Sequence, residues 1–460
     1  MSALYDSKSQ IDDRGLKQIL SKEHTVECWL KVERALAKAQ SELKMIPEEA
    51  YLDIEHFAKI ENVDFYRMDQ EKEIVGHGFA SFLRTIRPAL HEEGRKYLHY
   101  GCTTQNIQQT AQMIQMKEIY SVLYSFISDI LENLSMLASE HAYTIMPGRT
   151  HGKHAIPITY GYKCSVWISD LLDCIDRMKE SEKRIFTVMM GGAVGAFSAM
   201  QENGRKVQGL VAKELEMNEM DVPSRNRSGH KVEYLMVLSL LANTFHKFAE
   251  EVYYTGMEEF KEVSESYVKG TIGSSTMPQK INPKLAKGII ANSQKLYGLI
   301  STSLYSSCRM FEADSSSYML FDGLLVEASE LICEIIIRME ELTRTLQVNV
   351  ENMKRNAHIN KGLDNSEYIM MCLAKKIGKE KAHEVVYEDA VEAQIYQANF
   401  KNILLNDERI NNIFTDSDII SMMQPENYIG QCAELANEMS DKAHKKSVEL
   451  KRMEYKMESK

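Results

Sequence analysis

Apolar residues recur every three or four positions through most of this chain. One such stripe runs from Ile114 to Leu137, and similar stripes run through residues 232–252, 285–304 and 324–346. This spacing places apolar side chains on one face of an α-helix. Alternating apolar and polar runs bounded by turn residues, which are typical of strands, are scarce. The pattern therefore predicts an all-α protein and disfavours a parallel-sheet enzyme.

Several of these stripes exceed the roughly 11–12 residues of an ordinary globular helix. No proline stands between Pro283 and Pro425, so long helices can continue there without interruption. Most of the apolar positions are expected to pack between helices as core. Because the helices are long and partly apolar on two sides, they predict a bundle that also packs against other subunits.

Breaks rich in glycine and proline separate the stripes. They stand at Gly101, at a turn formed by Pro147-Gly148, at Gly191-Gly192, at Pro223 and across residues 270–283. Three regions are predicted from them: an N-terminal helical domain over 1–97, a central long-helix bundle over 98–350 and a C-terminal helical domain over 351–460. The tail from Ser440 is rich in lysine and glutamate and is expected to be a solvated helix or a frayed end.

The composition is that of a water-soluble globular protein, with 44% hydrophobic and 26% charged residues. A net charge of −11 disfavours nucleic acid as a partner. The longest apolar run, residues 331–337, falls short of the roughly 20 residues that span a bilayer. The opening residues are polar and mixed in charge, which predicts no signal peptide, and the eight cysteines are scattered singly. A cytoplasmic protein with reduced thiols is expected.

Residues 270–283 are the least ordinary segment of the chain. Two glycines and two prolines within it prevent a regular helix, so a loop is predicted. Glycines let backbone N–H groups approach a ligand closely, which favours anion binding. Composition alone fits a flexible surface linker equally well.

The sequence GSSTMPQKINP at 273–283 resembles the signature GSSxMPxKxNP of the fumarase, aspartase, argininosuccinate lyase and adenylosuccinate lyase superfamily, and every fixed position matches. Two upstream blocks support the resemblance. Residues 99–111 resemble HxGxTSxDixDTA, and residues 148–161 resemble GRTHGQxAxPxTFG. Shorter matches begin at Trp29 and Gly76, so the resemblance extends over about residues 25 to 330.

The resemblance implies three all-helical domains and a homotetramer whose central helices form one long bundle. Each active site would combine the three blocks from three different subunits. The partner is a small carboxylate substrate, with no cofactor, no nucleic acid and no membrane.

The resemblance also implies the chemistry, which removes a proton from the carbon next to a carboxylate and expels a group from the next carbon. Ser274 corresponds to the catalytic base, and a local positive field is needed to stabilise its alkoxide. Closure of the loop over the substrate would supply that field. His151 corresponds to the general acid, a role that suits histidine because it titrates near neutral pH. His77 is expected to orient or balance it.

Fixed cations and donors must stabilise the doubly negative aci-carboxylate intermediate, and Lys280 and Asn282 are the candidates. Thr103 and Thr104 match the pair that holds a substrate carboxylate. The other substrate-binding positions carried over are Ser275, Thr150, Lys153, Met277 and Arg225. His151 and His154 form an HxxH pair, but a pair without a third clustered ligand does not indicate a metal site.

Departures from the family pattern bear on the substrate. Lys153 replaces a glutamine, Gly78 and Asn226 each replace an aspartate, and Asn106 and Gln109 replace two more. These changes make the region less negative, which fits an additional carboxylate on the substrate.

Phe311 and Leu320 stand where adenylosuccinate lyases carry arginines that bind the nucleotide phosphate. An apolar side chain cannot replace a bidentate arginine, so adenylosuccinate itself is disfavoured as the substrate. The predicted function is a β-elimination, most simply C–N cleavage, that releases fumarate from an N-succinyl compound or related polycarboxylate. Three alternatives remain open: adenylosuccinate lyase proper, a 3-carboxymuconate cycloisomerase-like enzyme, and a non-catalytic helical scaffold.

Overall fold

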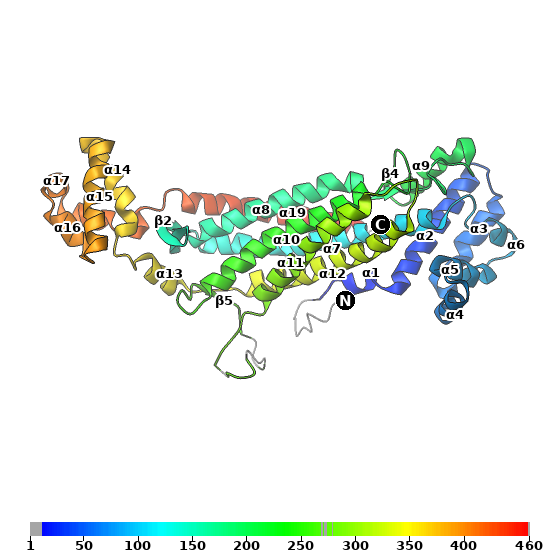
Figure 1. The fold of residues 1–460 in the computed structure, drawn as a ribbon, viewed down its shortest axis with the longest axis horizontal. Helices are drawn as coiled ribbons and strands as arrows, with labels where there is room; N and C mark the ends of the chain where they lie inside the picture. The colour runs from blue at the N-terminus through cyan, green and yellow to red at the C-terminus, as the bar shows by residue number, and fades with distance from the viewer. Residues whose placement is uncertain (1–11, 268–269, 271–273, 278, 459–460) are drawn as a thin grey trace. The chain divides into compact units, whose positions relative to one another are not determined.

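In the computed structural model, which describes residues 12–267, 270, 274–277 and 279–458, long helices dominate (Figure 1). Three of the four predicted stripes lie within one helix each and the fourth almost does, so the all-α prediction is confirmed. The stripe over 114–137 lies in α7, that over 232–252 in α10 and that over 285–304 in α11, and the stripe over 324–346 ends one residue beyond α12. The long helices are α7 (Thr104–Glu140), α8 (Tyr160–Ile185), α10 (Gly229–Thr255), α11 (Leu285–Ser307), α12 (Ser315–Thr345) and α19 (Cys432–Glu458). None of the described helices is long and apolar enough to cross a membrane.

The chain divides into two compact units, which are described separately. The first unit comprises Met1–Phe126, Cys174–Asn243 and Ala291–Ile337, and the second comprises Ile127–Asp173, Thr244–Ile290 and Arg338–Lys460. Helices α7, α8, α10, α11 and α12 each contribute residues to both units. The three-domain division drawn from the sequence therefore stays a prediction.

The first unit contains a series of shorter helices before α7. Trp29 of α2 packs edge-on against Phe79 and Phe82 of α5, with ring centroids 5.3 and 5.4 Å apart, and this aromatic cluster is part of the core. The short elements of this unit are α1 (Leu16–Ile19), α2 (Lys22–Glu42), α3 (Glu48–Phe57), η1 (Ile60–Asn62), α4 (Phe65–Val75), α5 (Gly78–Ile86), η2 (Arg87–Ala89), α6 (Glu92–Tyr97), β3 (Thr187–Val188), η3 (Gln201–Asn203), α9 (Gly204–Glu214) and β4 (Asn218–Glu219). Strands β3 and β4 pair in parallel.

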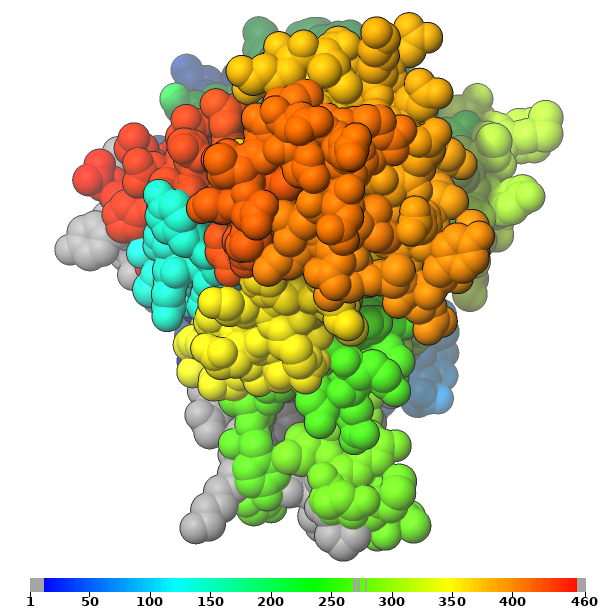
Figure 2. Space-filling model, turned by 90° about the vertical axis from the view of Figure 1, so that its left-hand side faces the viewer, coloured from blue at the N-terminus to red at the C-terminus, as the bar shows by residue number. Residues whose placement is uncertain are grey.

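The second unit contains a cluster of C-terminal helices that packs around Leu373, Phe400 and Leu404 (orange in Figure 2). Its short elements are β1 (Ile145–Thr150), β2 (Lys153–Thr159), β5 (Val263–Ser264), β6 (Gln347–Val348), α13 (Val350–Ala357), η4 (Leu363–Asn365), α14 (Ser366–Ile377), α15 (Lys379–Ile395), α16 (Phe400–Asn406), α17 (Glu408–Asn411), α18 (Asp416–Met422) and η5 (Pro425–Asn427). Strands β5 and β6 pair antiparallel.

Two local predictions in the second unit were wrong. The Pro147-Gly148 pair does not form a turn, because both residues lie within β1 at a register irregularity of the β1–β2 hairpin. The tail from Ser440 is not simply solvated either. The Ser440 hydroxyl hydrogen-bonds to Ser135, and Ala443 and Leu450 are buried, so α19 packs at least to Leu450.

Candidate active site

Ser274 lies in a non-helical segment, as the glycine and proline spacing predicts for the described part of 270–283. Its side chain is half-buried, and its Oγ accepts hydrogen bonds from the backbone N–H groups of Thr276 (3.3 Å) and Met277 (3.1 Å). Hydrogen bonds donated to an oxygen favour its anionic form. The arrangement thus suits an oxygen that must carry negative charge. Gly273 and Pro278 of the signature lie outside the described residues.

The other described signature residues are more open to solvent. Ser275, Met277 and Lys280 are exposed, and Asn282 is half-buried. The Lys280 N–H donates to the Met277 carbonyl over 3.0 Å, which closes a turn directly after Ser274 and its donors. The exposed Lys280 side chain therefore stands on the same short segment as Ser274.

Glu265 fixes the end of this segment to its beginning. Its carboxylate accepts hydrogen bonds from the backbone N–H groups of Lys284 (2.7 Å), Leu285 (3.0 Å) and Ala286 (2.7 Å). These donors would otherwise be unsatisfied in the first turn of α11. Burial raises the pKa of the Glu265 carboxyl, and the three backbone hydrogen bonds oppose that rise. The residue before 266–283 is consequently hydrogen-bonded to the residues directly after that segment.

His151 occupies the tip of the β1–β2 hairpin. Thr150 pairs with Lys153, and the two residues between them have positive φ, 51° at His151 and 71° at Gly152. Two left-handed residues define a type I′ turn, whose twist matches that of antiparallel strands. Histidine tolerates this conformation better than most residues. Thr150, His151 and Lys153 are all exposed, so the imidazole and the ammonium group stand on the same solvent-facing turn.

A buried ion pair ties this hairpin to the segment that leads into the signature loop. Arg149 donates two hydrogen bonds to the fully buried Glu262 carboxylate, one of them over 3.0 Å, and its guanidinium lies 5.1 Å from the Phe260 ring centroid. Asn356 Nδ2 donates to the same carboxylate over 2.9 Å. Glu262 directly precedes β5, and Glu265 follows that strand. Glu262, which supports the His151 hairpin, and Glu265, which supports the Ser274 loop, are thus three residues apart in the chain.

In the first unit, Asn106 organises the turn that carries Thr103. Its Oδ1 accepts from the N–H groups of Thr103 and Gly192, both over 3.1 Å, and the residue is fully buried. An uncharged amide at the family's aspartate position therefore still performs a structural task. Thr103 and Thr104 are half-buried at the start of α7. Gln109 is buried and donates to Gln105 over 2.9 Å.

Arg225 meets the same glycine segment from another direction. Its Nη1 donates to the Ala193 carbonyl over 3.0 Å, and its guanidinium lies 5.2 Å from the Tyr318 ring centroid. Since Gly192 bonds to Asn106, the structure brings Arg225 and the Thr103 turn onto one short loop. The first unit therefore presents hydroxyl groups, backbone amides and one guanidinium together.

Phe311 adjoins this group. Asn226 donates from Nδ2 to the carbonyl oxygens of Arg309 and Phe311, which fixes the chain where Phe311 adopts a positive φ of 63°. The Phe311 side chain is 78% exposed and that of Leu320 is 38% exposed. These apolar side chains are open to a ligand and cannot bind a phosphate.

His77 has a structural task in the described fold. It is the N-cap of α5, and its Nδ1 accepts from the Ala80 N–H over 3.2 Å. His154, the second histidine of the HxxH pair, lies 3.6 Å from an Asp364 carboxylate oxygen. A catalytic role for His77 stays a prediction.

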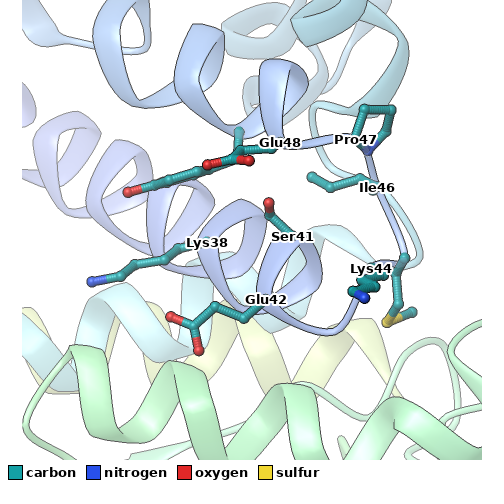
Figure 3. Close-up of a pocket in the computed structure, with 9 residues that line it drawn as sticks. Lys38, Ser41, Glu42, Lys44, Ile46, Pro47 and Glu48 are labelled. Carbon is teal, nitrogen blue, oxygen red and sulfur yellow. The ribbon is translucent and has the colours of Figure 1, made fainter.

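Two hollows among the described residues lie away from the predicted site residues. One, of about 700 Å³, follows the end of α2 and is lined by residues between Lys38 and Tyr51 (Figure 3). Another, of about 540 Å³, is lined by Lys261, the β5–β6 pair and the start of α13. Neither includes a predicted catalytic residue. The predicted site residues instead fall into two groups, with Ser274, Lys280 and His151 in the second unit and Thr103, Arg225 and His77 in the first.

Three supporting residues were not predicted from the sequence: Glu262, Glu265 and Asn356. The two glutamates stand a few residues before Gly270, in the stretch EVSES. Acidic residues at the entrance to an anion-binding loop are unexpected, and that mismatch is the signal that could have identified them. Asn356 carries no such signal.

Comparisons with known proteins bear on the class of this site. A family model described as "Lyase" matches residues 8–298, and one described as "Adenylosuccinate lyase C-terminus" matches residues 362–439. The helical fold and the signature loop define a lyase of the fumarase/aspartase superfamily. Within that class, the chain belongs to the adenylosuccinate lyase-like family, of the carbon–nitrogen lyase type.

Individual relatives cover nearly the whole chain. The chain is 32% identical over 429 residues to the adenylosuccinate lyase of Methanocaldococcus jannaschii, covering 92% of each. It is 30% identical over 427 residues to the N-acetyl-S-(2-succino)cysteine lyase of Enterococcus italicus, covering 92% of this chain and 93% of the other. The crystal structure of a fumarate lyase from Mesorhizobium sp. BNC1 superimposes with a TM-score of 0.87 at 26% identity, covering 95% and 99% of the two chains.

Proposed function

We propose that this lyase releases fumarate by β-elimination from a non-nucleotide N-succinyl compound or a related polycarboxylate. One observation carries the proposal: Ser274 Oγ accepts two backbone N–H groups inside a GSSTMPQKINP loop whose end is fixed by Glu265. A serine placed in this way can act as a base, because the donors stabilise its alkoxide.

The proposed elimination begins with proton removal and ends with protonation of the leaving nitrogen. Ser274 removes a proton from the carbon next to the substrate carboxylate, and Lys280 with Asn282 stabilises the resulting aci-carboxylate. The C–N bond then breaks, and its electron pair leaves with the nitrogen. His151 donates a proton to that nitrogen, which yields fumarate and a free amine. Thr103 and Thr104 hold a carboxylate of the substrate.

The choice of a non-nucleotide substrate rests on Phe311 and Lys153. Phe311 is exposed where a phosphate would need arginine, and Lys153 adds an exposed cation beside His151. Phe311 disfavours a phosphate dianion, and Lys153 supplies a cation that fits an additional carboxylate. The succinocysteine lyase of Enterococcus italicus is, by its name, a relative with a non-nucleotide substrate.

Adenylosuccinate lyase proper is the second candidate. The match of residues 362–439 to the adenylosuccinate lyase C-terminus favours it. Asn226, which directly follows Arg225, donates to the Arg309 and Phe311 carbonyl oxygens, so Arg225 and Arg309 are the candidates to replace the missing phosphate-binding arginines. Turnover of the nucleotide substrate would decide for this candidate.

We also propose a homotetramer with shared sites. Large apolar side chains remain exposed on the long helices, including Met236 and Leu240 on α10 and Met319 and Val326 on α12. In a bundle of several subunits these faces would be covered. Light scattering measures the assembly. Restored activity on mixing inactive Ser274→Ala subunits with inactive Thr103→Val subunits would show that the sites are shared.

The function is tested by following absorbance from new unsaturation while fumarate is quantified separately. Adenylosuccinate, argininosuccinate, aspartate, N-succinyl amino acids, N-acetyl-S-(2-succino)cysteine and 3-carboxy-cis,cis-muconate are offered in parallel, with Ser274→Ala as the background control. Fumarate from a non-nucleotide compound alone supports the proposal. Adenylosuccinate turnover at an ordinary rate overturns the substrate assignment. A lactone formed from a carboxymuconate without fumarate would indicate a cycloisomerase, and no product from any compound would favour a scaffold.

A further inference from the structure

His24, Cys28 and Glu118 form a cluster outside the elimination site. His24 and Cys28 stand one helical turn apart on α2, which places them on the same face, and Glu118 faces them from α7. One potential ligand atom from each residue lies within 4.8 Å of the other two. His24 Nε2 and Glu118 Oε2 are 2.5 Å apart. The set therefore offers a nitrogen, a sulfur and an oxygen to one point.

The thiol side of this cluster is buried, and its imidazole and carboxylate side is open to solvent. Cys28 is 1% exposed, whereas the side chains of His24 and Glu118 keep 23% and 33% exposure. The start of α2 is fixed on α7 by Gln115, whose side-chain amide donates to the Ile19 carbonyl and to the Thr25 hydroxyl. A ligand could enter from the solvent side and meet a positioned thiol.

We propose that His24, Cys28 and Glu118 bind a divalent cation of the zinc class, with water as the fourth ligand. Imidazole, thiolate and carboxylate are the ligands that Zn²⁺ takes in tetrahedral sites with one open position. Tetrahedral Zn²⁺ separates its ligand atoms by roughly 3.3–3.6 Å, given bond lengths of about 2.0–2.3 Å. The His24–Glu118 pair would have to open by about 0.8 Å, and the sulfur would have to approach by up to about 1.3 Å, which side-chain rotation allows.

Protons are exchanged when the cation binds. The hydrogen bond with Glu118 raises the pKa of His24, and burial raises the pKa of the Cys28 thiol, with Glu118 adding to that rise. Binding therefore releases the thiol proton, and also the imidazole proton where His24 is charged, as the metal–sulfur and metal–nitrogen bonds form. Of the neighbours on α2, Glu27 favours a cation and Lys31 opposes it. Affinity should consequently rise with pH.

The test is titration of the full-length protein, stripped with a chelator, with Co²⁺. We expect one equivalent to bind with a thiolate-to-cobalt charge-transfer band in the near ultraviolet, and Zn²⁺ to displace it. Cys28→Ser should abolish the band, while Cys308→Ser, which removes an exposed thiol, should keep it. His24→Ala and Glu118→Gln should each weaken binding at least about tenfold.

Thermal unfolding supplies a second readout that needs no spectrum. Zn²⁺ should raise the melting temperature of the wild type and of Cys308→Ser, but not that of Cys28→Ser. The proposal is overturned if the wild type shows no band and no Zn²⁺-dependent shift, which would leave a plain His24–Glu118 ion pair. It is equally overturned if Cys28→Ser shows the same cobalt band and the same Zn²⁺-dependent rise in melting temperature as the wild type. Since no step measures turnover, the outcome is independent of the proposed elimination.

Discussion

The buried Arg149–Glu262 pair allows a prediction whose size follows from burial. The Glu262 side chain is fully buried, whereas that of Arg149 is 20% exposed. Arg149→Met leaves the Glu262 charge with the Asn356 amide as its remaining described partner. Removing one partner from a buried pair costs about 3–5 kcal/mol. Loss of the contact with the Phe260 ring adds about 0.5–1 kcal/mol to that cost.

Removing the carboxylate instead of the guanidinium should lower the free energy of unfolding by less. Glu262→Gln leaves a cation that can reach water and keeps a carbonyl oxygen as acceptor, so we expect about 1–2 kcal/mol. The double variant Arg149→Met/Glu262→Gln buries no charge and should be more stable than Arg149→Met alone.

Amide hydrogen exchange over residues 145–159 measures the effect in the hairpin that carries His151. Because about 1.4 kcal/mol corresponds to tenfold, the summed cost of about 3.5–6 kcal/mol should accelerate exchange in Arg149→Met by roughly three-hundredfold to twenty-thousandfold. Amides in the capping box of Thr415 and Asp418 on α18 are the internal control and should not change. Equal losses of stability in Arg149→Met and Glu262→Gln would refute the argument from burial. A double variant less stable than both single variants would also refute it.

Three further substitutions test the catalytic serine, the packing of the β1–β2 hairpin and the ionisation of a buried carboxyl group. Ser274→Ala should abolish turnover yet leave substrate affinity in calorimetry nearly unchanged, and wild-type rates would remove this serine from the mechanism. Gly148→Ala places a Cβ 2.5 Å from a carbonyl oxygen of the opposite strand and should cost about 1–3 kcal/mol in urea unfolding. Gly78→Ala, where a Cβ meets open space, is its control, and equal losses would contradict the steric reason. Burial, with a second carboxyl nearby, raises the pKa of Asp389 to about 7. The folded chain then holds a proton that the unfolded chain lacks, so stability is lost as pH rises from about 4 to 7. Asp389→Asn should therefore melt a few degrees above wild type at pH 8 and converge with it near pH 4, and parallel curves would exclude this titration.

Long helices could be predicted from the sequence because their stripes repeat over several turns. The stripe over 285–304 needed only its own periodicity to identify α11. The β1–β2 hairpin could not be predicted in that way, since Pro147, Gly148 and Pro157 interrupt any alternation and suggest a turn in the wrong place. The packing of α19 was also missed, because it depends on contact with Ser135, some 300 residues earlier in the chain.

The reactive residues of the candidate site could be predicted, whereas their supports could not. Ser274 and Lys280 belong to a short contiguous pattern, so their neighbours identify them. The partners of Arg149 and of the α11 N-terminus come from distant segments, and a glutamate gives no local sign of what it will bond. Asn106 shows the reverse case, because its replacement of an aspartate suggested altered specificity while its oxygen serves the backbone.

The three hydrogen bonds between the Glu265 carboxylate and the start of α11 bear on how substrate specificity could change in such an enzyme. Glu265 stands before this segment and accepts from the backbone N–H groups at the start of α11, so one carboxylate holds the two ends of the segment together. The entropy of closing a loop grows only slowly with its length, by about 0.6 kcal/mol per doubling. A change of length between Glu265 and the signature could therefore be accommodated at a small entropic cost, while Ser274, Lys280 and Asn282 are kept. New substrates could then be acquired there without rebuilding the helices.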